Sequence, residues 1–514
     1  MDSNRRRLYA ALAAHDPRLD GVFFVGVTST GIYCRPTCTV RTPKSTNCRF
    51  FSSAGAAEQE GFRPCLRCRP ELAPGLPIDD SQRVARLIVQ RLEEAALDER
   101  KGLDAIAGQF ELSARQMRRL VREALGVSPM QLLRTRRLLL AKQLLTETRL
   151  RVADVSGAAG FSSVRRLNED FRLRYRMPRA RLRRTAAAQT AATGGGTSTL
   201  QLAYRPPYDW DGILAFLGAR ALKGVEWIGG DAYWRTVRLG GVQGWIRVTS
   251  AQGKNALRLE FAHSLTPALP ALLNRVRALF DLNARPDLIS THLAGDVRLA
   301  GEVARNPGIR VPGAFEGFEI GLRAILGQQI TVKGATTIAG RFVEAFGDPI
   351  VTPVAALHRL TPRASRVAAA GVGDIARLGI VAARARSLIA LAEAQRSHAL
   401  CLDGGAHQRP EETIERLVEL PGIGAWTAQY IAMRALQWPD AFPKEDVVIR
   451  ANLGGITAKE AEALSQPWRP WRSYAVMHVW RMAGQHASIR RPAGAGTRGG
   501  LRPLRVTGGR HDPG

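Results

Sequence analysis

The spacing of apolar and polar residues changes along the chain and divides it into regions with different expected structures. Residues 81–184 contain short stretches with apolar residues three to four positions apart, whereas residues 200–282 alternate, as in Trp234-Arg-Thr-Val-Arg-Leu and Trp245-Ile-Arg-Val-Thr. Helical spacing returns after residue 282 and continues to Arg481. Such spacing predicts amphipathic helices, and alternation predicts half-buried strands. The pattern therefore predicts a multidomain α+β protein that is mostly α, with a small antiparallel α/β sheet domain in its middle.

The composition of two segments marks boundaries between these regions. Residues 185–198 are small and uncharged and include three consecutive glycines, which predicts a flexible linker. Residues 485–514 are rich in Gly, Arg and Pro, which predicts a disordered tail. At 514 residues the chain is also too long for a single core. The expected folded units are 1–76, 81–184, 199–282 and 283–484.

The charge balance points to a polyanionic partner. The chain has 74 Lys and Arg against 45 Asp and Glu, and residues 81–184 alone carry 24 basic against 11 acidic residues. This excess favours nucleic acid over a small acidic substrate. An anionic membrane is the alternative, but the sequence has neither an apolar run near the ~18 residues of a spanning helix nor the apolar core of a secretory signal. Six cysteines are too few for a disulfide framework, so we expect a cytoplasmic, nucleoid-associated protein.

Four of the six cysteines form two short hooks. Three residues separate Cys34 from Cys38, and two separate Cys65 from Cys68. Each spacing lets two thiolates face one tetrahedral ion, and four sulfurs without a nearby His favour zinc. The spacing alone leaves open whether the zinc only holds a small fold together or takes part in chemistry. The remaining cysteines, which we assign no role, are Cys48 and Cys401.

The sequence around the hooks resembles the N-terminal zinc domain of the Ada alkylation-response proteins. The matching stretches are DPRLDGVFFVGVTSTGIYCRPTC and RFFSSAGAAEQEGFRPCLRCRPE, within roughly residues 7 to 75. The resemblance implies that Cys34 accepts a methyl group from a methylated DNA phosphate while Cys38, Cys65 and Cys68 complete the zinc shell. Zinc keeps a thiol deprotonated as a soft nucleophile, which suits this transfer. Methylation would reduce the negative charge of the site and so change its affinity for DNA phosphates. The candidate phosphate contacts near the hooks are Arg35, Arg41, Arg67 and Arg69.

The basic region contains two copies of a helix-turn-helix pattern. In the first copy a polar turn and a Ser113 N-cap precede a basic amphipathic helix, and in the second the helix begins near Ser162. A longer helix, Pro129 to Glu147, separates the copies, and this double helix-turn-helix resembles the AraC-type activator domain. The resemblance implies that the two helices enter successive major grooves of DNA. The residues expected nearest the bases or phosphates are Arg115, Gln116, Arg119, Ser163, Arg165 and Arg166.

The second copy departs from the AraC-type pattern at two points. Arg176 stands where the family has Gly after Tyr175, and Ser156-Gly157 interrupts a stretch that is normally apolar and helix-forming. We therefore expect the second copy to be less stable than the first.

A glycine-rich hairpin occurs in the C-terminal half. The segment Leu417-Val-Glu-Leu-Pro-Gly-Ile-Gly-Ala-Trp-Thr-Ala-Gln-Tyr predicts two helices joined by a tight turn, where Gly422 and Gly424 allow backbone N–H groups to approach a DNA phosphate. Taken alone, the hairpin could be only a tight connection between helices. Together with Pro439-Asp-Ala-Phe-Pro-Lys-Glu-Asp-Val-Val-Ile-Arg, however, it resembles the helix-hairpin-helix DNA glycosylases, and most closely the AlkA or 3-methyladenine-DNA glycosylase II group. The resemblance runs from about residue 200 to 483.

The resemblance to AlkA implies the parts of a base-excision site. Asp446 would be the catalytic carboxylate, which stabilises the positive charge that builds on the sugar as the glycosidic bond breaks. Trp426, Tyr430 and Trp480 would form an aromatic pocket for the flipped base, although an aromatic stripe at helical spacing is more often core. For Glu445 we prefer a role as a solvated or helix-capping carboxylate.

Two positions refine the expected chemistry. Trp426 stands where bifunctional relatives carry a Schiff-base Lys, which predicts a monofunctional glycosylase without strand-cleaving lyase activity. Gln329 stands where some members carry an apolar wedge that fills the vacated base stack, and a polar amide at this position could hydrogen-bond the orphan base instead.

The combined hypothesis is an alkylation-damage-responsive repair enzyme and transcription regulator. The expected partners are alkylated and operator double-stranded DNA, with RNA polymerase as a candidate, no membrane, and a monomeric chain. The alternative is a transcription regulator whose glycosylase-like half binds DNA without catalysis, and a further alternative is a purely structural zinc site. No Pro-Cys-His-Arg segment occurs, so the O6-alkylguanine methyltransferase domain common in Ada proteins is not expected.

Overall fold

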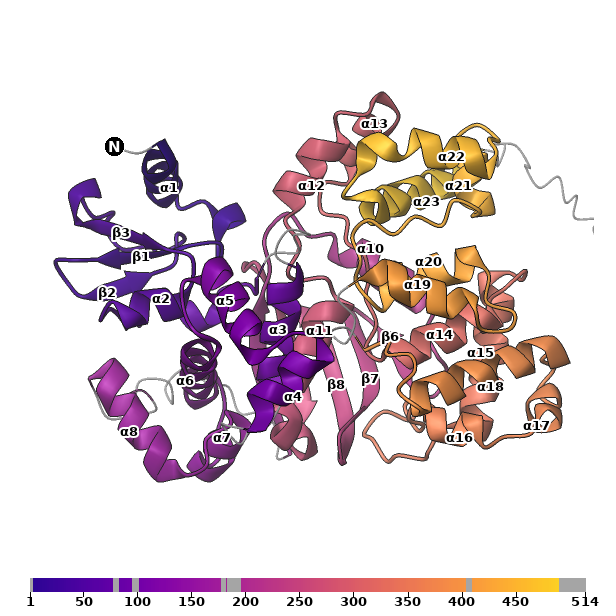
Figure 1. Ribbon diagram of the computed structural model, residues 1–514, viewed down its shortest axis with the longest axis horizontal. Coiled ribbons are helices and arrows are strands. Elements are labelled where there is room, and N and C mark those ends of the chain that lie inside the picture. The colour runs from indigo at the N-terminus through magenta and orange to yellow at the C-terminus, as the bar shows by residue number, and fades with distance from the viewer. Residues whose placement is uncertain are drawn as a thin grey trace, which may run out of the picture.

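The computed structural model describes residues 3–76, 83–94, 101–176, 182, 196–403 and 409–489. Within these residues the chain is multidomain and mostly helical, with a small antiparallel sheet in its middle, as predicted (Figure 1). The cysteine-rich region contains a second small sheet, which was not predicted. Most of the expected linker, 185–195, and of the expected tail, 490–514, lies outside the described residues. The first strand after the linker begins at Thr197 and the last helix ends at Ile489, so regular structure extends into the ends of both segments.

The cysteine-rich region is a four-stranded sheet with two helices. The strands are β1 (Phe24–Val27), β2 (Ile32–Cys34), β3 (Cys48–Phe51) and β4 (Arg63–Pro64), in the order β3-β1-β2-β4. β1 pairs antiparallel with β2 and β3, and β4 pairs parallel with β2. The helices are α1 (Ser3–Ala13) and α2 (Ala54–Gln59). The parallel pair matters most, because each of its two strands leads into one cysteine hook.

The basic region is helical throughout its described part. Its helices are α3 (Arg83–Glu94), α4 (Lys101–Gln109), α5 (Ala114–Leu125), α6 (Pro129–Glu147), α7 (Val152–Ala158) and α8 (Val164–Tyr175). The long helix between the copies has the predicted bounds. The last helix is capped by Ser163, one residue later than predicted. Arg176 ends it in the left-handed conformation, with φ of +52°, where a Gly would be unstrained.

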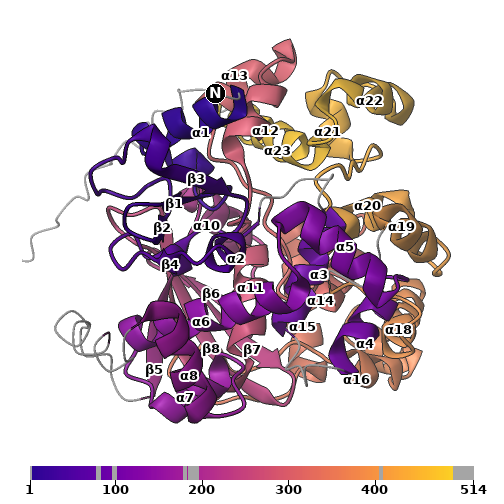
Figure 2. The same ribbon diagram turned by 60° about the vertical axis from the view of Figure 1, so that its left-hand side comes forward.

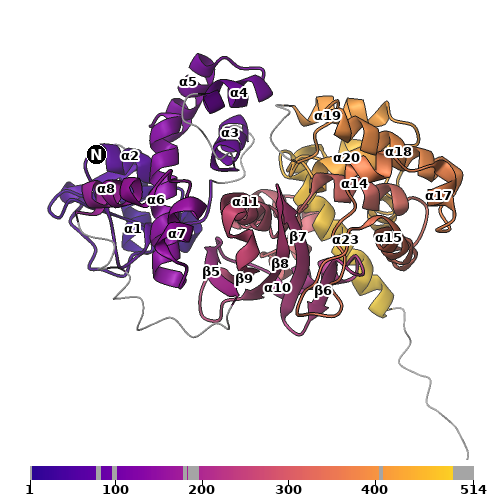
Figure 3. The same cartoon turned by 90° about the horizontal axis from the view of Figure 1, so that it is seen from below.

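The alternating region forms a five-stranded antiparallel sheet in the order β5-β9-β8-β7-β6. Its strands are β5 (Thr197–Ala203), β6 (Glu226–Gly229), β7 (Ala232–Leu239), β8 (Val242–Ser250) and β9 (Ala256–Ala262). The helices α10 (Trp210–Gly218) and α11 (Leu269–Leu279) pack beside it (Figure 3).

The C-terminal region contains two groups of helices with separate cores. The first group comprises α14 (Gly317–Leu326), α15 (Val332–Phe346), α16 (Ala364–Ala368), α17 (Val372–Ala376), α18 (Ala382–Arg396), α19 (Pro410–Val418) and α20 (Ala425–Arg434). The second comprises α12 (Pro286–Leu293), α13 (Val297–Arg305), α21 (Val447–Asn452), α22 (Ala458–Leu464) and α23 (Arg472–Ile489). Figure 1 shows the second group stacked above the first, with α20 facing it.

The N-terminal and C-terminal halves share buried structure. Leu138 and Leu144 of α6 belong to the same core as Leu200 and Leu202 of β5, and Figure 2 shows α6 beside this strand. Arg205, which is fully buried, donates hydrogen bonds to the carbonyl oxygens of Asp20 (3.0 Å), Gly75 (2.8 Å) and Asn283 (3.0 Å). The two halves are therefore packed together.

Candidate zinc centre and base-excision site

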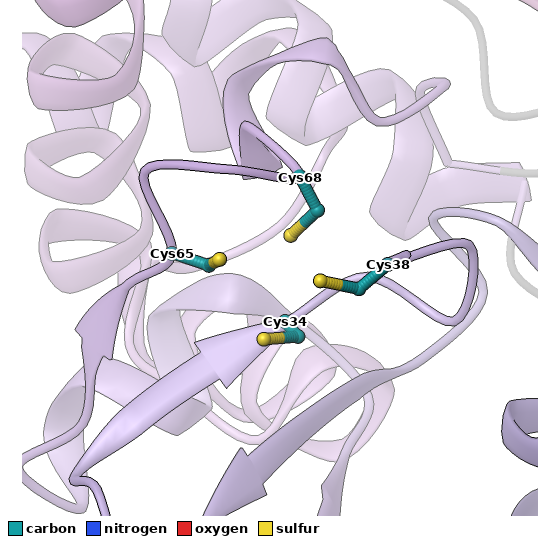
Figure 4. A group of neighbouring side chains, drawn as sticks. All are labelled: Cys34, Cys38, Cys65 and Cys68. Carbon is teal, nitrogen blue, oxygen red and sulfur yellow. The ribbon is translucent and has the colours of Figure 1, made fainter. Parts of the chain in front are cut away.

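The two cysteine hooks meet at one point (Figure 4). Cys34 ends β2 and Cys65 follows β4, and the backbone N–H of Cys65 donates to Tyr33 O at 3.0 Å, so the parallel pairing brings the hooks together. The four Sγ atoms lie within 4.8 Å of one another, and only Cys68 is partly exposed. Zinc–sulfur bonds of about 2.3 Å put the sulfurs of a tetrahedral site about 3.8 Å apart. The cluster therefore fits zinc, and the predicted ligand set is brought together in full.

Two of the four arginines near the hooks are held inside the protein. The Arg35 guanidinium pairs with the Asp20 carboxylate and donates to Cys68 O at 3.1 Å, and its backbone N–H donates to Cys68 Sγ at 3.4 Å. Arg69 pairs with Glu71 at 2.9 Å and Glu147 at 2.7 Å. The predicted phosphate contacts are wrong for these two residues, because their guanidiniums are already used.

The other two arginines near the hooks, Arg41 and Arg67, are exposed, and their contact with DNA stays a prediction. Cys48, to which no role was assigned, lies in a separate small core with Val25 and Leu12, so it is an ordinary packed thiol.

The two recognition helices are fixed by their caps. Ser113 and Gln116 form a capping box, in which the Gln116 carboxamide accepts the Ser113 N–H at 2.8 Å. Ser163 accepts the Arg166 N–H at 3.1 Å. Gln116 and Ser163 thus start the two helices, and both are exposed. Their expected place near the bases or phosphates of DNA stays a prediction.

The four arginines predicted on these helices face outward. The Arg119 and Arg165 side chains are 76% and 89% exposed, and within the described part of the chain each pairs only with a glutamate one turn along its own helix. Arg115 is also exposed, and Arg166 is half-exposed. Their contact with DNA stays a prediction.

Asp446 lies where the two helix groups of the C-terminal region meet. It is the N-cap of α21, and its Oδ1 accepts the Ile449 N–H at 2.9 Å. Trp426 of α20 donates its indole N–H to Oδ2 at 2.8 Å, and Trp480 of α23 donates to Oδ1 at 3.2 Å. The sequence predicted these three side chains together but not that both indoles would hold the carboxylate. Three N–H donors thus fix the orientation of the carboxylate.

The aromatic residues line up beside this carboxylate. Trp426 and Tyr430 stack with ring centroids 5.5 Å apart and an interplanar angle of 10°, and Trp480 lies 6.4 Å from Tyr430. Trp426 and Trp480 are only partly buried, so their rings are not sealed in a core. The structure brings the predicted pocket residues together.

Residues that the sequence analysis missed lie behind Tyr430. Arg434, one turn further along α20, donates to the Tyr430 hydroxyl at 2.7 Å, and its guanidinium lies 5.0 Å from the Phe216 ring of α10. Burial acts to raise the pKa of the Tyr430 phenol, but the nearby guanidiniums of Arg434 and Arg220 outweigh it and lower the pKa. The four-residue spacing from Tyr430 to Arg434 was a signal that could have revealed this contact.

The hairpin requires glycine at one of its two glycine positions. Gly422 has a φ of +74°, and a Cβ there would lie 2.3 Å from Ser387 Oγ. Gly424 is the N-cap of α20, with open space where a Cβ would lie. Gly424 therefore leaves the helix N-terminus accessible, which suits a phosphate contact.

Glu445, next to Asp446, does not have the expected role. The cap of α21 is Asp446, and Glu445 is only partly exposed, with Oε2 buried and without a hydrogen-bond partner among the described residues. The capping role considered for Glu445 is therefore wrong, whereas its carboxylate is partly solvated.

Family models match the chain in four successive segments. They are the metal binding domain of Ada (7–71), a helix-turn-helix domain (106–185), the AlkA N-terminal domain (199–316) and the HhH-GPD superfamily base excision DNA repair protein (322–469). Together with the geometry above, they define a class: DNA-binding repair proteins that join an Ada-type zinc centre to a helix-hairpin-helix glycosylase fold.

Curated relatives narrow this class to a family. A probable bifunctional transcriptional activator/DNA repair enzyme AlkA of Mycobacterium tuberculosis is 38% identical over 490 residues, which cover 93% of this chain and 97% of that protein. DNA-3-methyladenine glycosylase 2 of Escherichia coli is 33% identical over 285 residues, covering 55% of this chain and 97% of the relative. The E. coli bifunctional transcriptional activator/DNA repair enzyme Ada is 34% identical over 123 residues, covering 24% and 33%. The chain belongs to the family of bifunctional transcriptional activator/DNA repair enzymes of the AlkA type.

Family membership and geometry agree on the main components. The protein is a DNA repair enzyme and transcription regulator with a zinc site, and DNA is its partner. In the parts of the chain that the structure covers, no helix has the length and apolar character needed to cross a bilayer.

Proposed function

We propose that the C-terminal half releases alkylated bases such as 3-methyladenine from double-stranded DNA, with Asp446 as the catalytic carboxylate. The observation that carries this proposal is the Asp446 carboxylate, held by two indole N–H groups at the edge of the aromatic pocket. As the glycosidic bond breaks, positive charge builds on the sugar, and a carboxylate of fixed orientation stabilises it. A ring-alkylated base is itself cationic and leaves neutral, so it needs little help from a general acid. Electron-rich rings favour such a base by roughly 0.5 to 2 kcal/mol.

The same half is proposed to be a monofunctional glycosylase. Trp426 occupies the position of the Schiff-base Lys, and its indole is engaged with Asp446. Borohydride trapping of a covalent adduct between the protein and damaged DNA would contradict this assignment.

The test of the glycosylase assignment is the variant Asp446→Asn on methylated DNA. Asn can still cap α21, so the fold is preserved while the negative charge is removed. We expect base release to fall by about 10²- to 10³-fold. The matched control is Asp296→Asn, because Asp296 also caps a helix and also accepts an indole N–H, from Trp468 at 2.8 Å, away from the pocket. If the parent protein releases no base, the half only binds DNA.

The zinc centre is proposed to accept a methyl group from DNA methylphosphotriesters on Cys34. The backbone N–H of Arg35 donates to Cys68 Sγ at 3.4 Å, and among the described residues no hydrogen-bond donor to the Cys34 sulfur is found. A hydrogen bond draws electron density from a thiolate, so the Cys34 sulfur is more nucleophilic than that of Cys68. The choice of Cys34 over Cys38 and Cys65 follows the resemblance to the Ada zinc domain.

The transfer balances as a direct displacement. Bound zinc supplies a deprotonated sulfur of low proton affinity. A lone pair on Cys34 Sγ forms a bond to the methyl carbon while the carbon–oxygen bond breaks, and the phosphate leaves as a diester anion. Mass spectrometry after incubation with methylated DNA should place the methyl group on Cys34 alone. If Cys34→Ser and Cys68→Ser lose methyl uptake together with zinc and fold, the site is only structural.

We propose that the basic helices bind operator DNA with an affinity that depends on whether Cys34 is methylated. The transfer removes one negative charge from the centre, so repulsion from DNA phosphates falls. Operator affinity of the methylated and unmethylated protein at one salt concentration tests this switch, and equal affinities contradict it. We further propose a monomer that acts in the nucleoid and contacts RNA polymerase.

A further inference from the structure

One face of the five-stranded sheet carries three neighbouring tryptophans. Trp227 of β6 and Trp234 of β7 are paired in register, with ring centroids 6.0 Å apart and an interplanar angle of 46°. The Trp245 ring of β8 lies 5.5 Å from that of Trp234, at 33°. The alternate positions of these strands, such as Tyr233 and Ile246, belong to the core that the sheet shares with α10 and α11. Since side chains alternate between the faces of a strand, the tryptophans lie on the face turned away from these helices.

The Trp227 ring lies along its own strand and stays open to solvent. A Cβ at Gly229, two residues further along β6, would lie 2.1 Å from Cη2 of this ring, so the ring covers the Gly229 backbone. Trp227 is 39% exposed, and Trp234 and Trp245 are partly exposed. A single exposed apolar side chain is ordinary, whereas a contiguous group rimmed by polar residues marks a binding surface.

A cation lies beside the tryptophans on the same face. Arg247 of β8 is the register partner of Trp234, and its guanidinium lies 5.2 Å from the centroid of that ring. Arg247 is also the register partner of Glu260 of β9, and the two side chains pair at 3.6 Å. One row of the sheet thus runs from aromatic rings to an ion pair, without further apolar side chains.

The next row of the same face adds positive charge. Arg258 of β9 is exposed, and it is the register partner of Gln201 of β5. Lys254, in the turn between β8 and β9, donates to Gln201 Oε1 at 3.4 Å, so its ammonium group lies on this row. The charges of Arg247 and Glu260 cancel, and the other two cations therefore leave the face positively charged. A positive face beside electron-rich rings is complementary to a nucleic-acid strand.

We propose that this face binds single-stranded DNA, with bases stacked on the tryptophans and phosphates paired with Arg258 and Lys254. Bases of any sequence stack on aromatic side chains, while basic groups follow the backbone. Aromatic side chains on neighbouring strands of a sheet bind unpaired bases in this way. A duplex cannot use the same surface, because its bases are stacked on one another and their faces are hidden. The inference is independent of the activities proposed for Cys34 and Asp446, which lie in other parts of the fold.

The experiment compares two affinities of the full-length protein at one salt concentration. The probes are a fluorescein-labelled oligothymidylate of about 12 nucleotides and an undamaged duplex of equal length, and fluorescence anisotropy is the measurement. Trp227→Thr keeps a residue that favours strands, and it should weaken oligothymidylate binding about tenfold through the loss of one stacked base. Duplex binding should stay within about twofold, since the helices bind the duplex. Trp227→Phe keeps an aromatic ring and should retain most of the affinity for oligothymidylate.

A second variant tests the charge on this face. Arg258→Gln should weaken oligothymidylate binding, and the slope of log affinity against log salt should become shallower by about 0.7, as for one phosphate contact of a single strand. The matched control is Leu288→Ala, which removes an apolar side chain that is 50% exposed on α12 and should change neither affinity.

Three results would overturn the inference. The first is equal binding of oligothymidylate by the parent protein and Trp227→Thr. The second is an equal loss of oligothymidylate and duplex binding in Trp227→Thr, because the face would then not distinguish single strands. The third is a parent protein that forms dimers in sedimentation, with Trp227→Thr monomeric and oligothymidylate binding unchanged, which would assign the face to a second copy of the chain.

Discussion

The two halves of the molecule hold their reactive groups in different ways. In the N-terminal half, four sulfurs are brought together by a parallel strand pair whose second strand, β4, has two residues, and the surrounding cores are small. In the C-terminal half, Asp446 is held by three N–H donors between two large cores. A small domain with little apolar surface depends on its metal for stability, whereas the carboxylate site depends on packing. The two halves should therefore lose their structure and activity under different conditions.

Removal of zinc should produce the largest difference in behaviour between the two halves. Chelation should abolish methyl uptake and unfold the cysteine-rich region, because the binding energy of a structural zinc is folding energy. Base release should stay within about twofold, since the described residues of the C-terminal helices contain no cluster of metal ligands. Limited proteolysis around residues 3–76, methyl transfer and base release, measured on one sample, check this. Full methyl uptake by metal-free protein would contradict the comparison.

Acidification should act on the C-terminal half through His478. Burial lowers the pKa of this imidazole to about 4, from 6.5, and Arg481 adds to the effect. The unfolded chain therefore binds the proton first, so stability is full above pH 6.5 and is lost as the pH falls through 4. The loss should approach about 3 kcal/mol at low pH. Denaturant unfolding of wild type and His478→Met at pH 7 and pH 4.5 measures it.

The contribution of His478 to stability is isolated by comparing wild type with His478→Met, and not by the pH dependence of wild type alone. Asp281 has the opposite sign, because burial raises its pKa to about 6 and its contribution is present below pH 3.8 and lost as the pH rises through 6. If wild type and His478→Met lose the same stability between the two pH values, His478 is not responsible.

Removal of one indole donor should weaken catalysis at Asp446. Trp480→Phe keeps an aromatic ring in the pocket but loses the N–H that lies 3.2 Å from the carboxylate. One hydrogen bond to a charged group is worth about 1.5 kcal/mol, so kcat should fall roughly tenfold. The control is Trp468→Phe, which loses the bond to Asp296 and should leave kcat unchanged. Single-turnover base release is the measurement, and equal rates for the two variants would contradict the role of Trp480.

The smallest expected effect concerns the second helix-turn-helix copy. The first copy has a capping box at Ser113 and ends on Gly126, whereas α8 ends on Arg176 with φ of +52°. Arg176→Gly should relieve this strain and stabilise the protein by about 1 kcal/mol. Thermal unfolding of the variant against wild type checks it, and Gly126→Arg should destabilise by a similar amount.

The sequence predicted the features that depend on the spacing of nearby residues. It failed for contacts between residues that are far apart in the chain. The hooks, the helix bounds at Pro129 and Glu147 and the meeting of Asp446 with its tryptophans were predicted from spacing and resemblance. Arg35 was misjudged because its partner, Asp20, is fifteen positions away and nothing local announces the pair.

Some details could have been read from the sequence. Ser113 and Gln116 have the Ser-x-x-Gln spacing of a capping box, which the structure contains. For Glu445 and Asp446 the choice of cap depends on where α21 begins, and sequence patterns place helix ends only to within a few residues.

The buried guanidinium of Arg205 has a consequence for how this protein is inherited. It closes a seam between the two halves, and burial holds its pKa at about 9, well below that of a free Arg. A gene split between the halves would leave the carbonyl groups of Asp20 and Gly75 and a leucine-lined face open to water. Recombination that joins the zinc-containing half to a different enzyme would therefore require new residues at this interface. This requirement favours inheritance of the two halves together, as one gene.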